Sequence, residues 1–163
     1  MTLAHAANQC VTVLPTATGM GLFATQAAEP GGALAELDGT IAATPTVYSI
    51  EMGSGQHLAP LPDVLQANDL TRCRWRFLNH SCAPNCWIDG RTLRALRRID
   101  AHEQLTFDYN TTEWSMDVPF TCACGACHGD TISGYAHLNA AERARREPHC
   151  AAHLRSRVVH GNA

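Results

Sequence analysis

Short apolar runs with alternating polar positions predict a chain built mainly of β-strands. Residues 10–14 alternate and stop at Pro15, and residues 33–37 and 46–52 alternate in the same way. A period of two places every second side chain on one face of a strand, so each run is expected to be half-buried. Residues 93–99 have helical apolar spacing, but the run is too short to decide between helix and strand.

Two short helices are expected near the C-terminus. Asn139 is placed to cap a helix over residues 140–147, with Glu142 at the capping-box position and Pro148 as the terminator. A second helix is expected over residues 149–159. The pattern as a whole therefore predicts a β-rich fold that ends in short helices.

A polar turn within residues 76–86 concentrates hydrogen-bonding side chains and thiols at one point. Its centre is Asn79-His80-Ser81-Cys82, and Pro84 rules out a continuing helix because proline lacks a backbone N–H and favours extended geometry before it. Such a turn favours a functional site over an ordinary surface loop. Two further segments follow it, residues 103–109 (EQLTFDY) and residues 120–127 (FTCACGAC).

These three segments, in this order, resemble the SET-domain protein lysine methyltransferases. The likeness lies in the asparagine-histidine-serine-cysteine turn, the leucine-threonine-phenylalanine-aspartate-tyrosine strand end and the post-SET cysteine cluster. It extends from about residue 10 to residue 138. The wording of residues 108–114 and 119–122, then Gly134-Tyr135, is similar to the compact bacterial branch of that family.

The resemblance implies a fold and a division of the chain. The fold is mainly β, with small curved sheets and a knot-like core that threads residues 79–82 together with residues 105–109. Short C-terminal helices and a cysteine-rich post-SET lid follow. We expect a SET domain over residues 1–118, and a post-SET zinc-binding segment with the C-terminal helices over residues 119–163.

The resemblance also implies that the chain binds S-adenosylmethionine. The glycine-rich run before residue 23 is similar to the motif whose backbone holds this methyl donor in the family, although a Gly-x-Gly by itself also fits a hairpin turn. Asn79 and His80 resemble the pair that contacts the donor through a side-chain amide and through backbone. The expected donor-binding residues are Gly19, Met20, Gly21, Leu22, Arg76, Phe77, Asn79, His80 and Tyr109.

Three aromatic residues are expected in the catalytic channel. Tyr109 matches the family's strand-end tyrosine, whose hydroxyl orients the substrate amine beside the departing methyl group. Phe107 points to the same side of the strand, and phenylalanine there implies room for more than one methyl. Leu37 stands where the family often has a channel tyrosine; Tyr48 either supplies the missing aromatic or is a half-buried strand residue.

Methyl transfer to lysine requires a neutral amine. The pKa of free lysine is near ~10.4, so deprotonation at pH 7 costs about 4–5 kcal/mol. A dry channel and the neighbouring sulfonium charge both lower that pKa. The chemistry thus requires alignment of donor and acceptor more than a strong general base.

The late cysteine cluster predicts a zinc site. Its members are Cys122, Cys124 and Cys127. A closed structural site needs four ligands, and the resemblance gives Cys82 as the fourth, with Cys86 or His128 as alternatives. The spacing after the second late cysteine is shorter than is usual in the family, so a tighter loop is expected.

The composition indicates the class of protein and the cellular location in which this chemistry is expected. The chain has 163 residues, 45% hydrophobic and 17% charged, which is typical of one soluble globular domain. No apolar run is long enough to span a membrane. No lysine or arginine precedes Arg72, so a secretory signal is not expected and a cytoplasmic location is. Clustered cysteines in that setting favour metal binding over disulfides.

The distribution of charged residues along the chain limits the kinds of binding partner that are expected. All twelve basic residues are arginine, which excludes Schiff-base chemistry and methylation of the chain's own lysine side chains. The first 71 residues hold six acidic residues and no basic one, a bias that attracts a basic peptide or simply favours solubility. The expected partner is a basic protein or peptide carrying a lysine. Neither a nucleic acid nor a membrane is expected.

Two other functions compete with methyl transfer. Leu37 and the short cysteine loop motivate a catalytically inactive SET-fold module that binds proteins and retains cofactor binding. A zinc-built nucleic-acid binder is disfavoured by the net charge of −3.

Overall fold

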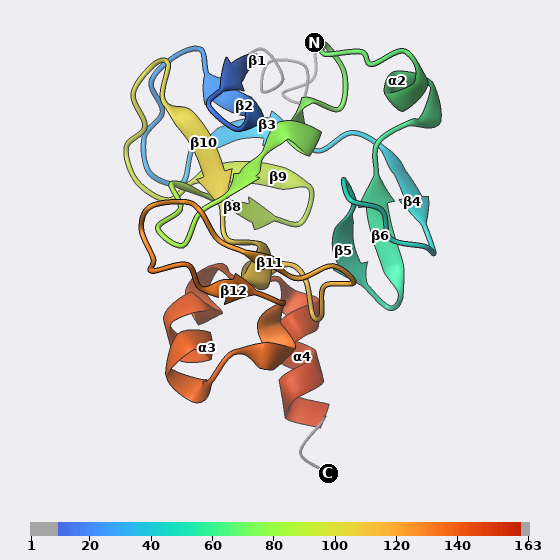
Figure 1. Cartoon of the computed structure of the whole chain (residues 1–163), viewed down its shortest axis with the longest axis vertical. Helices are drawn as coiled ribbons and strands as arrows, with labels where there is room; N and C mark the ends of the chain where they lie inside the picture. The colour runs from blue at the N-terminus through green and yellow to red at the C-terminus, as the bar shows by residue number, and fades with distance from the viewer. Residues whose placement is uncertain (1–9, 161–163) are drawn as a thin grey trace.

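Four small β-sheets and a few short helices make up residues 10–160, the part of the chain that this computed structural model describes (Figure 1). The strands are β1 (Val11–Thr16), β2 (Gly19–Ala24), β3 (Ala33–Glu36), β4 (Thr40–Ala42), β5 (Ile50–Gly53), β6 (Gln56–Ala59), β7 (Asn79–His80), β8 (Cys86–Asp89), β9 (Thr92–Ala95), β10 (Gln104–Phe107), β11 (Phe120–Thr121) and β12 (Thr131–Ile132). The helices are α2 (Pro62–Gln66), α3 (Ala140–Arg146) and α4 (Ala152–His160), with 3₁₀ turns η1 (Arg74–Phe77), η2 (Tyr109–Thr111), η3 (Tyr135–His137) and η4 (Glu147–His149). The prediction of a mainly β fold with short helices at its end is confirmed.

Strand β10 joins segments that are far apart in the sequence. It lies between β2 and β7 in a sheet of order β1-β2-β10-β7, antiparallel to β2 and parallel to β7. Leu105 pairs with Leu22, and Thr106 pairs with Asn79. The Ser81 N–H then donates to the Phe107 carbonyl at 3.1 Å. The polar turn is thereby held against the end of β10, which is the threaded core that the family resemblance implies.

Buried aliphatic side chains from three of the sheets form one main core. Leu22, Leu34, Leu58, Leu93 and Leu105 have almost no exposed surface. Burial of each such side chain contributes about 1.5–3 kcal/mol. The other two of these three sheets have the strand orders β3-β9-β8 and β4-β6-β5. The fourth sheet consists of β11 and β12. Residues 93–95 lie in β9, as the resemblance implies for the run 93–99, whereas residues 96–99 lie beyond the end of this strand.

Two predicted strands have different bounds in the structure. β1 continues through Pro15 to Thr16, because β1 is an edge strand and proline is tolerated where no neighbour needs its N–H. The strand expected over residues 46–52 begins only at Ile50. Thr46 N–H donates to the Ser49 hydroxyl at 2.8 Å, and this hydroxyl donates back to the Thr46 carbonyl at 2.9 Å. These bonds close a turn that competes with strand pairing.

The C-terminal helices pack below the sheets in the view of Figure 1. Asn139 and Glu142 form the expected capping box at the start of α3. Pro148 lies in η4, so α4 begins at Ala152, later than predicted. Tyr135, Cys150 and Leu154 form a second small hydrophobic core in this part of the chain. No helix within residues 10–160 is long and apolar enough to cross a membrane.

Candidate active site

A cavity of about 660 Å³ opens where β10 ends. Its aromatic lining residues are Tyr48, Trp75, Phe107, Tyr109, Trp114 and Phe120. Its charged or titratable lining residues also include Glu51, His57, Arg76, Glu113, Asp117 and Arg157. An aromatic wall with a few acidic groups suits a long aliphatic side chain that ends in a cation.

Tyr109 is fixed in the wall of this cavity with its hydroxyl oriented. The hydroxyl donates to the Leu78 carbonyl at 2.7 Å, and the ring lies 4.8 Å from the Phe107 ring, centroid to centroid. Burial, and then the charge of Glu113, raise the pKa of Tyr109 to about 12. The hydroxyl therefore stays protonated at neutral pH and acts as a hydrogen-bond donor.

Tyr48 lies in the same wall although it is not in a strand. The turn before β5 carries it, and 44% of its surface is exposed. Leu37 is 1% exposed and packs in the main core. The structure thus places the aromatic side chain of Tyr48, and not that of residue 37, in the cavity wall.

His80 connects the Tyr109 backbone with the cysteine cluster. The Tyr109 N–H donates to His80 Nδ1 at 3.2 Å, so Nδ1 is unprotonated and Nε2 carries the ring proton. His80 Nε2 lies 3.4 Å from Cys82 Sγ, and its N–H can donate a hydrogen bond to this sulfur. Burial lowers the pKa of His80 more than the nearby Asp108 carboxylate raises it, which keeps the ring neutral as this arrangement requires.

Two predicted donor-binding segments, the glycine-rich run and the polar turn, are in contact with each other. Asn79 Nδ2 donates to the Met20 carbonyl at 3.0 Å, which ties the polar turn to the glycine-rich run. Gly19 has φ of +141°, a backbone conformation that favours glycine. A Cβ at Gly21 would lie 2.7 Å from the Gln104 side-chain nitrogen, so only glycine fits without a shift.

Of the predicted donor-binding residues, the structure brings only Arg76 and Tyr109 into the lining of the cavity. The Arg76 guanidinium is buried and donates to the Asp69 and Arg72 carbonyls at 2.8 and 3.2 Å. The expected donor-binding residues that do not line it are Gly19, Met20, Gly21, Leu22, Phe77, Asn79 and His80. Leu22 is fully buried, which leaves only its backbone available to a ligand.

Asn85 is a positioning residue to which the sequence analysis gave no role. It is 3% exposed, and its Nδ2 donates to the Glu103 carboxylate and to the Gln104 carbonyl. Its Oδ1 accepts the Thr106 N–H at 2.9 Å. Asn85 therefore fastens the end of the polar turn to β10. The sequence signal that could have indicated this role is an asparagine within the polar turn, between Pro84 and Cys86.

A pair of glutamates at the cavity was also missed. The Glu51 N–H donates to Glu113 Oε1 at 3.0 Å, and the Trp114 N–H donates to Glu51 Oε2 at 2.8 Å. Arg157 of α4 binds the other Glu51 oxygen at 2.9 Å. Glu113 lies four residues after Tyr109, and this helical spacing is the sequence signal that could have revealed it.

A buried ion pair joins α3 to the residue before Tyr109. Arg146 Nε lies 2.6 Å from Asp108 Oδ2, with side-chain exposures of 9% and 5%. Asp108 Oδ1 accepts the Asn110 N–H at 3.0 Å. Asp108 points away from the cavity, as the alternation along β10 predicts, and serves as a structural anchor for the turn that carries Tyr109.

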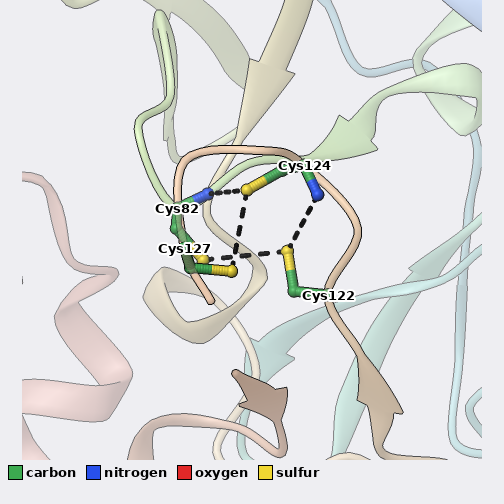
Figure 2. A group of neighbouring side chains, drawn as sticks. All are labelled: Cys82, Cys122, Cys124 and Cys127. Carbon is green, nitrogen blue, oxygen red and sulfur yellow. Dashed lines mark hydrogen bonds between the residues drawn. The ribbon is translucent and has the colours of Figure 1, made fainter. Parts of the chain in front are cut away.

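Four cysteines converge from the loop after β7 and the loop after β11 (Figure 2). They are Cys82, Cys122, Cys124 and Cys127, and their sulfur atoms all lie within 4.8 Å of one another. Cys82 Sγ is 3.8 Å from Cys122 Sγ, and Cys124 Sγ is 4.0 Å from Cys127 Sγ. Four thiolates around one zinc at about 2.3 Å would be separated by about 3.8 Å, so this set fits a tetrahedral metal. Cys86 is buried in β8 and takes no part in the group.

Backbone donors prepare the cluster for negative charge. Burial alone would raise the pKa of Cys124, but the N–H groups of Cys82 and Ala126, each 3.4 Å from its sulfur, outweigh it and lower that pKa to about 6. Burial raises the pKa of Cys122 to about 11. A bound cation would stabilise the remaining thiolates, since metal ligation requires the deprotonated form.

Comparison with known proteins gives these features a family context. The sequence pattern of the SET domain matches residues 19–110. A histone-lysine N-methyltransferase, H3 lysine-4 specific, from Emericella nidulans is 43% identical over 65 residues, which are 33% of this chain and 5% of that protein. Methyltransferase flvH from Aspergillus flavus is 31% identical over 103 residues, which are 60% of this chain and 52% of that protein. The chain therefore spans about half the length of these relatives or much less.

A solved structure shares the architecture. The crystal structure of KRYPTONITE in complex with mCHG DNA and SAH matches with a TM-score of 0.56 and 23% identity, over 73% of this chain and 28% of that one. At this identity the likeness concerns the fold alone.

Proposed function

The chain belongs to the SET-domain family, and from this premise we propose that it is an S-adenosylmethionine-dependent methyltransferase that acts on lysine side chains of a protein. The observation that carries the proposal is the fixed Tyr109 hydroxyl, held by the Leu78 carbonyl in the wall of an aromatic cavity. The Tyr109 hydroxyl oxygen and the Leu78 carbonyl oxygen lie together here and can orient an amine towards a methyl donor. The aromatic and acidic lining suits a lysine side chain.

In this proposal the three channel aromatics divide the work. Tyr109 orients the amine in line with the sulfonium methyl, which lowers the barrier chiefly by alignment. Phe107 leaves room beside it for an amine that already carries a methyl group. Tyr48 covers the aliphatic part of the lysine from the rim of the cavity.

The methyl donor would lie against the glycine-rich run and the polar turn. The Asn79–Met20 hydrogen bond supports this placement, because it brings the two expected donor-binding segments into contact. Backbone of residues 19–22 and of residues 76–80 would hold the donor, and Tyr109 would face it from the end of β10. The donor supplies the methyl group as an electrophile and leaves as the thioether.

The cysteine cluster would hold a structural zinc and define a post-SET lid. Cys82 belongs to the polar turn, so a metal bound there ties residues 119–163 to the SET domain of residues 1–118. The contact between His80 Nε2 and Cys82 supports this link between metal and active site. Assignment to the compact bacterial branch stays a prediction from the motifs, since the relatives above are fungal.

The substrate would be a basic, lysine-bearing protein. The acidic first part of the chain and the acidic cavity lining support this, and the printed name of the Emericella nidulans relative concerns histone H3. A cytoplasmic location and the absence of a nucleic-acid partner stay predictions from the sequence.

Calorimetry with S-adenosylmethionine, combined with transfer of labelled methyl to a basic protein mixture, tests the proposal. Binding and labelling are expected for the wild type, and loss of labelling with retained binding for Tyr109→Phe. The chain has no lysine, so its own side chains cannot obscure the lysine signal. Cofactor binding with equal labelling by Tyr109→Phe would overturn the enzymatic role of this tyrosine, and binding without any labelling would favour the non-catalytic module.

A further inference from the structure

Glu113 is a half-buried carboxylate one turn away from Tyr109. The Glu113 N–H donates to the Tyr109 carbonyl at 3.0 Å, a bond between residues four apart as in a helix. Residues at this spacing lie on one side of a helical turn, with Cβ atoms about 5–6 Å apart. Both side chains line the same cavity. An amine that reaches the Tyr109 hydroxyl thus enters the neighbourhood of a carboxylate.

The two oxygens of this carboxylate have different surroundings. Oε1 accepts the Glu51 N–H at 3.0 Å and the Thr112 hydroxyl at 3.2 Å. Oε2 accepts no hydrogen bond from any of residues 10–160. It is also not one of the fully buried side-chain atoms without a partner, so it is accessible from outside the protein. The hydrogen bonds to Oε1 therefore fix the carboxylate, and Oε2 stays available to a ligand in the cavity that Glu113 lines.

The neighbouring glutamate is committed elsewhere. Glu51 is 7% exposed, and its oxygens bind the Trp114 N–H and the Arg157 guanidinium. Its charge is compensated by a cation, whereas that of Glu113 is not. Of these two glutamates, only Glu113 has a carboxylate oxygen that accepts no hydrogen bond from the described part of the chain, and this oxygen can take a proton from a ligand.

We propose that Glu113 is a catalytic residue that accepts the proton of the substrate lysine ammonium before methyl transfer. This inference rests on the proposed function. The ammonium gives one proton to Glu113 Oε2, which yields a neutral amine and a neutral carboxylic acid. The amine lone pair then forms the bond to the methyl carbon while the carbon–sulfur bond breaks, and its electron pair stays on sulfur. The products are a methylammonium and a thioether.

The electrostatic surroundings suit this role. Burial, and then the charges of Glu51 and Asp117, raise the pKa of Glu113 to about 7. A base is most effective when its pKa lies near the working pH. The other titratable or charged groups lining the cavity are Tyr48, His57, Arg76, Tyr109 and Arg157. A dry channel lowers the pKa of the lysine towards that of the carboxylate, so the proton transfer becomes less costly than in water.

The test compares pH profiles of kcat/KM for the wild type and Glu113→Gln, with recombinant histone H3 and a lysine-bearing peptide mixture as probes. Glutamine keeps the Oε1 acceptor and removes the basic oxygen. The wild-type rate is expected to rise through the pKa of Glu113 and to level off above it. The variant is expected to be about 10²-fold slower at pH 7 and to approach the wild type near pH ~10, where free lysine is itself neutral. Glu29→Gln, which removes an exposed carboxylate outside the cavity, is the matched control and should keep the wild-type profile.

Each outcome decides the matter. An unchanged pH profile in Glu113→Gln, an equal loss at every pH or a rise in KM alone would overturn the role of a base. If Glu113→Gln does not fold, Glu113→Asp should show the same loss at pH 7 with recovery at high pH. A readout without substrate is the carboxyl ¹³C titration of glutamate-labelled protein, in which one glutamate should titrate far above the usual range. No methylation by the wild type on either probe, with the methyl donor bound, would defeat the proposed function itself; an active wild type with an unchanged variant defeats only this inference.

Discussion

Replacement of Arg146 by methionine tests how the C-terminal helices support the active site. Arg146 is the sole cation on Asp108 in the described part of the chain, at 2.6 Å, and both side chains are almost fully buried. Methionine keeps much of the volume but leaves the Asp108 carboxylate with only Asn110 and the neutral His80 ring beside it. An uncompensated buried charge results.

The expected cost follows from that burial. Removal of one partner of a buried ion pair destabilises a protein by about 3–5 kcal/mol. For a chain of this size, 1 kcal/mol corresponds to about 2–4 °C in Tm, so Tm should fall by about 6–20 °C. Since Asp108 directly precedes Tyr109 and caps the turn η2, methyl transfer should fall as well, even at temperatures where the variant is folded.

Urea and thermal unfolding of four proteins measure the effect: wild type, Arg146→Met, Asp108→Asn and the double variant. The double variant should recover much of the loss, because it leaves no unpaired charge, and the coupling energy should be about 2–3 kcal/mol. Arg145→Met, on the exposed side of the same helix, is the control and should change stability by less than about 0.5 kcal/mol. A cost below about 1 kcal/mol for Arg146→Met, or a coupling energy near zero, would refute the reasoning.

Three further predictions concern the cavity and the metal. Tyr109→Phe loses the hydrogen bond to Leu78 and should lower kcat by about 10²-fold or more while calorimetry shows unchanged donor binding; a smaller effect contradicts its proposed role. Phe107→Tyr narrows the channel and should shift the products towards a single methyl, as mass spectrometry of a methylated peptide would show; an unchanged distribution contradicts the steric argument. Cys124→Ser should abolish the binding of about one zinc per chain and should lower Tm as much as a chelator lowers it for the wild type. Cys86→Ser is the control and should leave the metal content unchanged. Loss of zinc in Cys86→Ser but not in Cys124→Ser would exclude the four-cysteine site.

Local sequence patterns were enough for elements whose stability is local. The capping box at Asn139 and Glu142 satisfies the free N–H groups of a helix start within a few residues, so α3 was predicted with its true beginning. Alternation predicted β3 in the same way. Alternation gave the wrong strand start for residues 46–52, because the hydrogen bonds between Thr46 and Ser49 form a turn. Side chains in a turn do not alternate between two faces as they do in a strand.

The candidate site shows the same division between local and long-range information. The spacing of Cys122, Cys124 and Cys127 predicted a metal site, and the family resemblance added Cys82 as the fourth ligand. The structure brings these four thiols together. The position of Tyr48 in the cavity wall depends on a turn that the pattern did not reveal. Asn85, Glu51 and Glu113 were missed because their roles arise from contacts with β10, α4 and the turn η2.

By itself the sequence determined the composition of the strands, the capped helix and the three late cysteines, since each depends on residue type and short spacing. Cys82 and Tyr109 were expected from the family resemblance. Only the tertiary structure decided which of the two cavity glutamates, Glu51 or Glu113, is compensated by a cation. That difference comes from Arg157, which is distant from Glu51 in the chain and adjacent to it in space. The free energy of a buried charge depends on its neighbours in three dimensions, and no local pattern contains them.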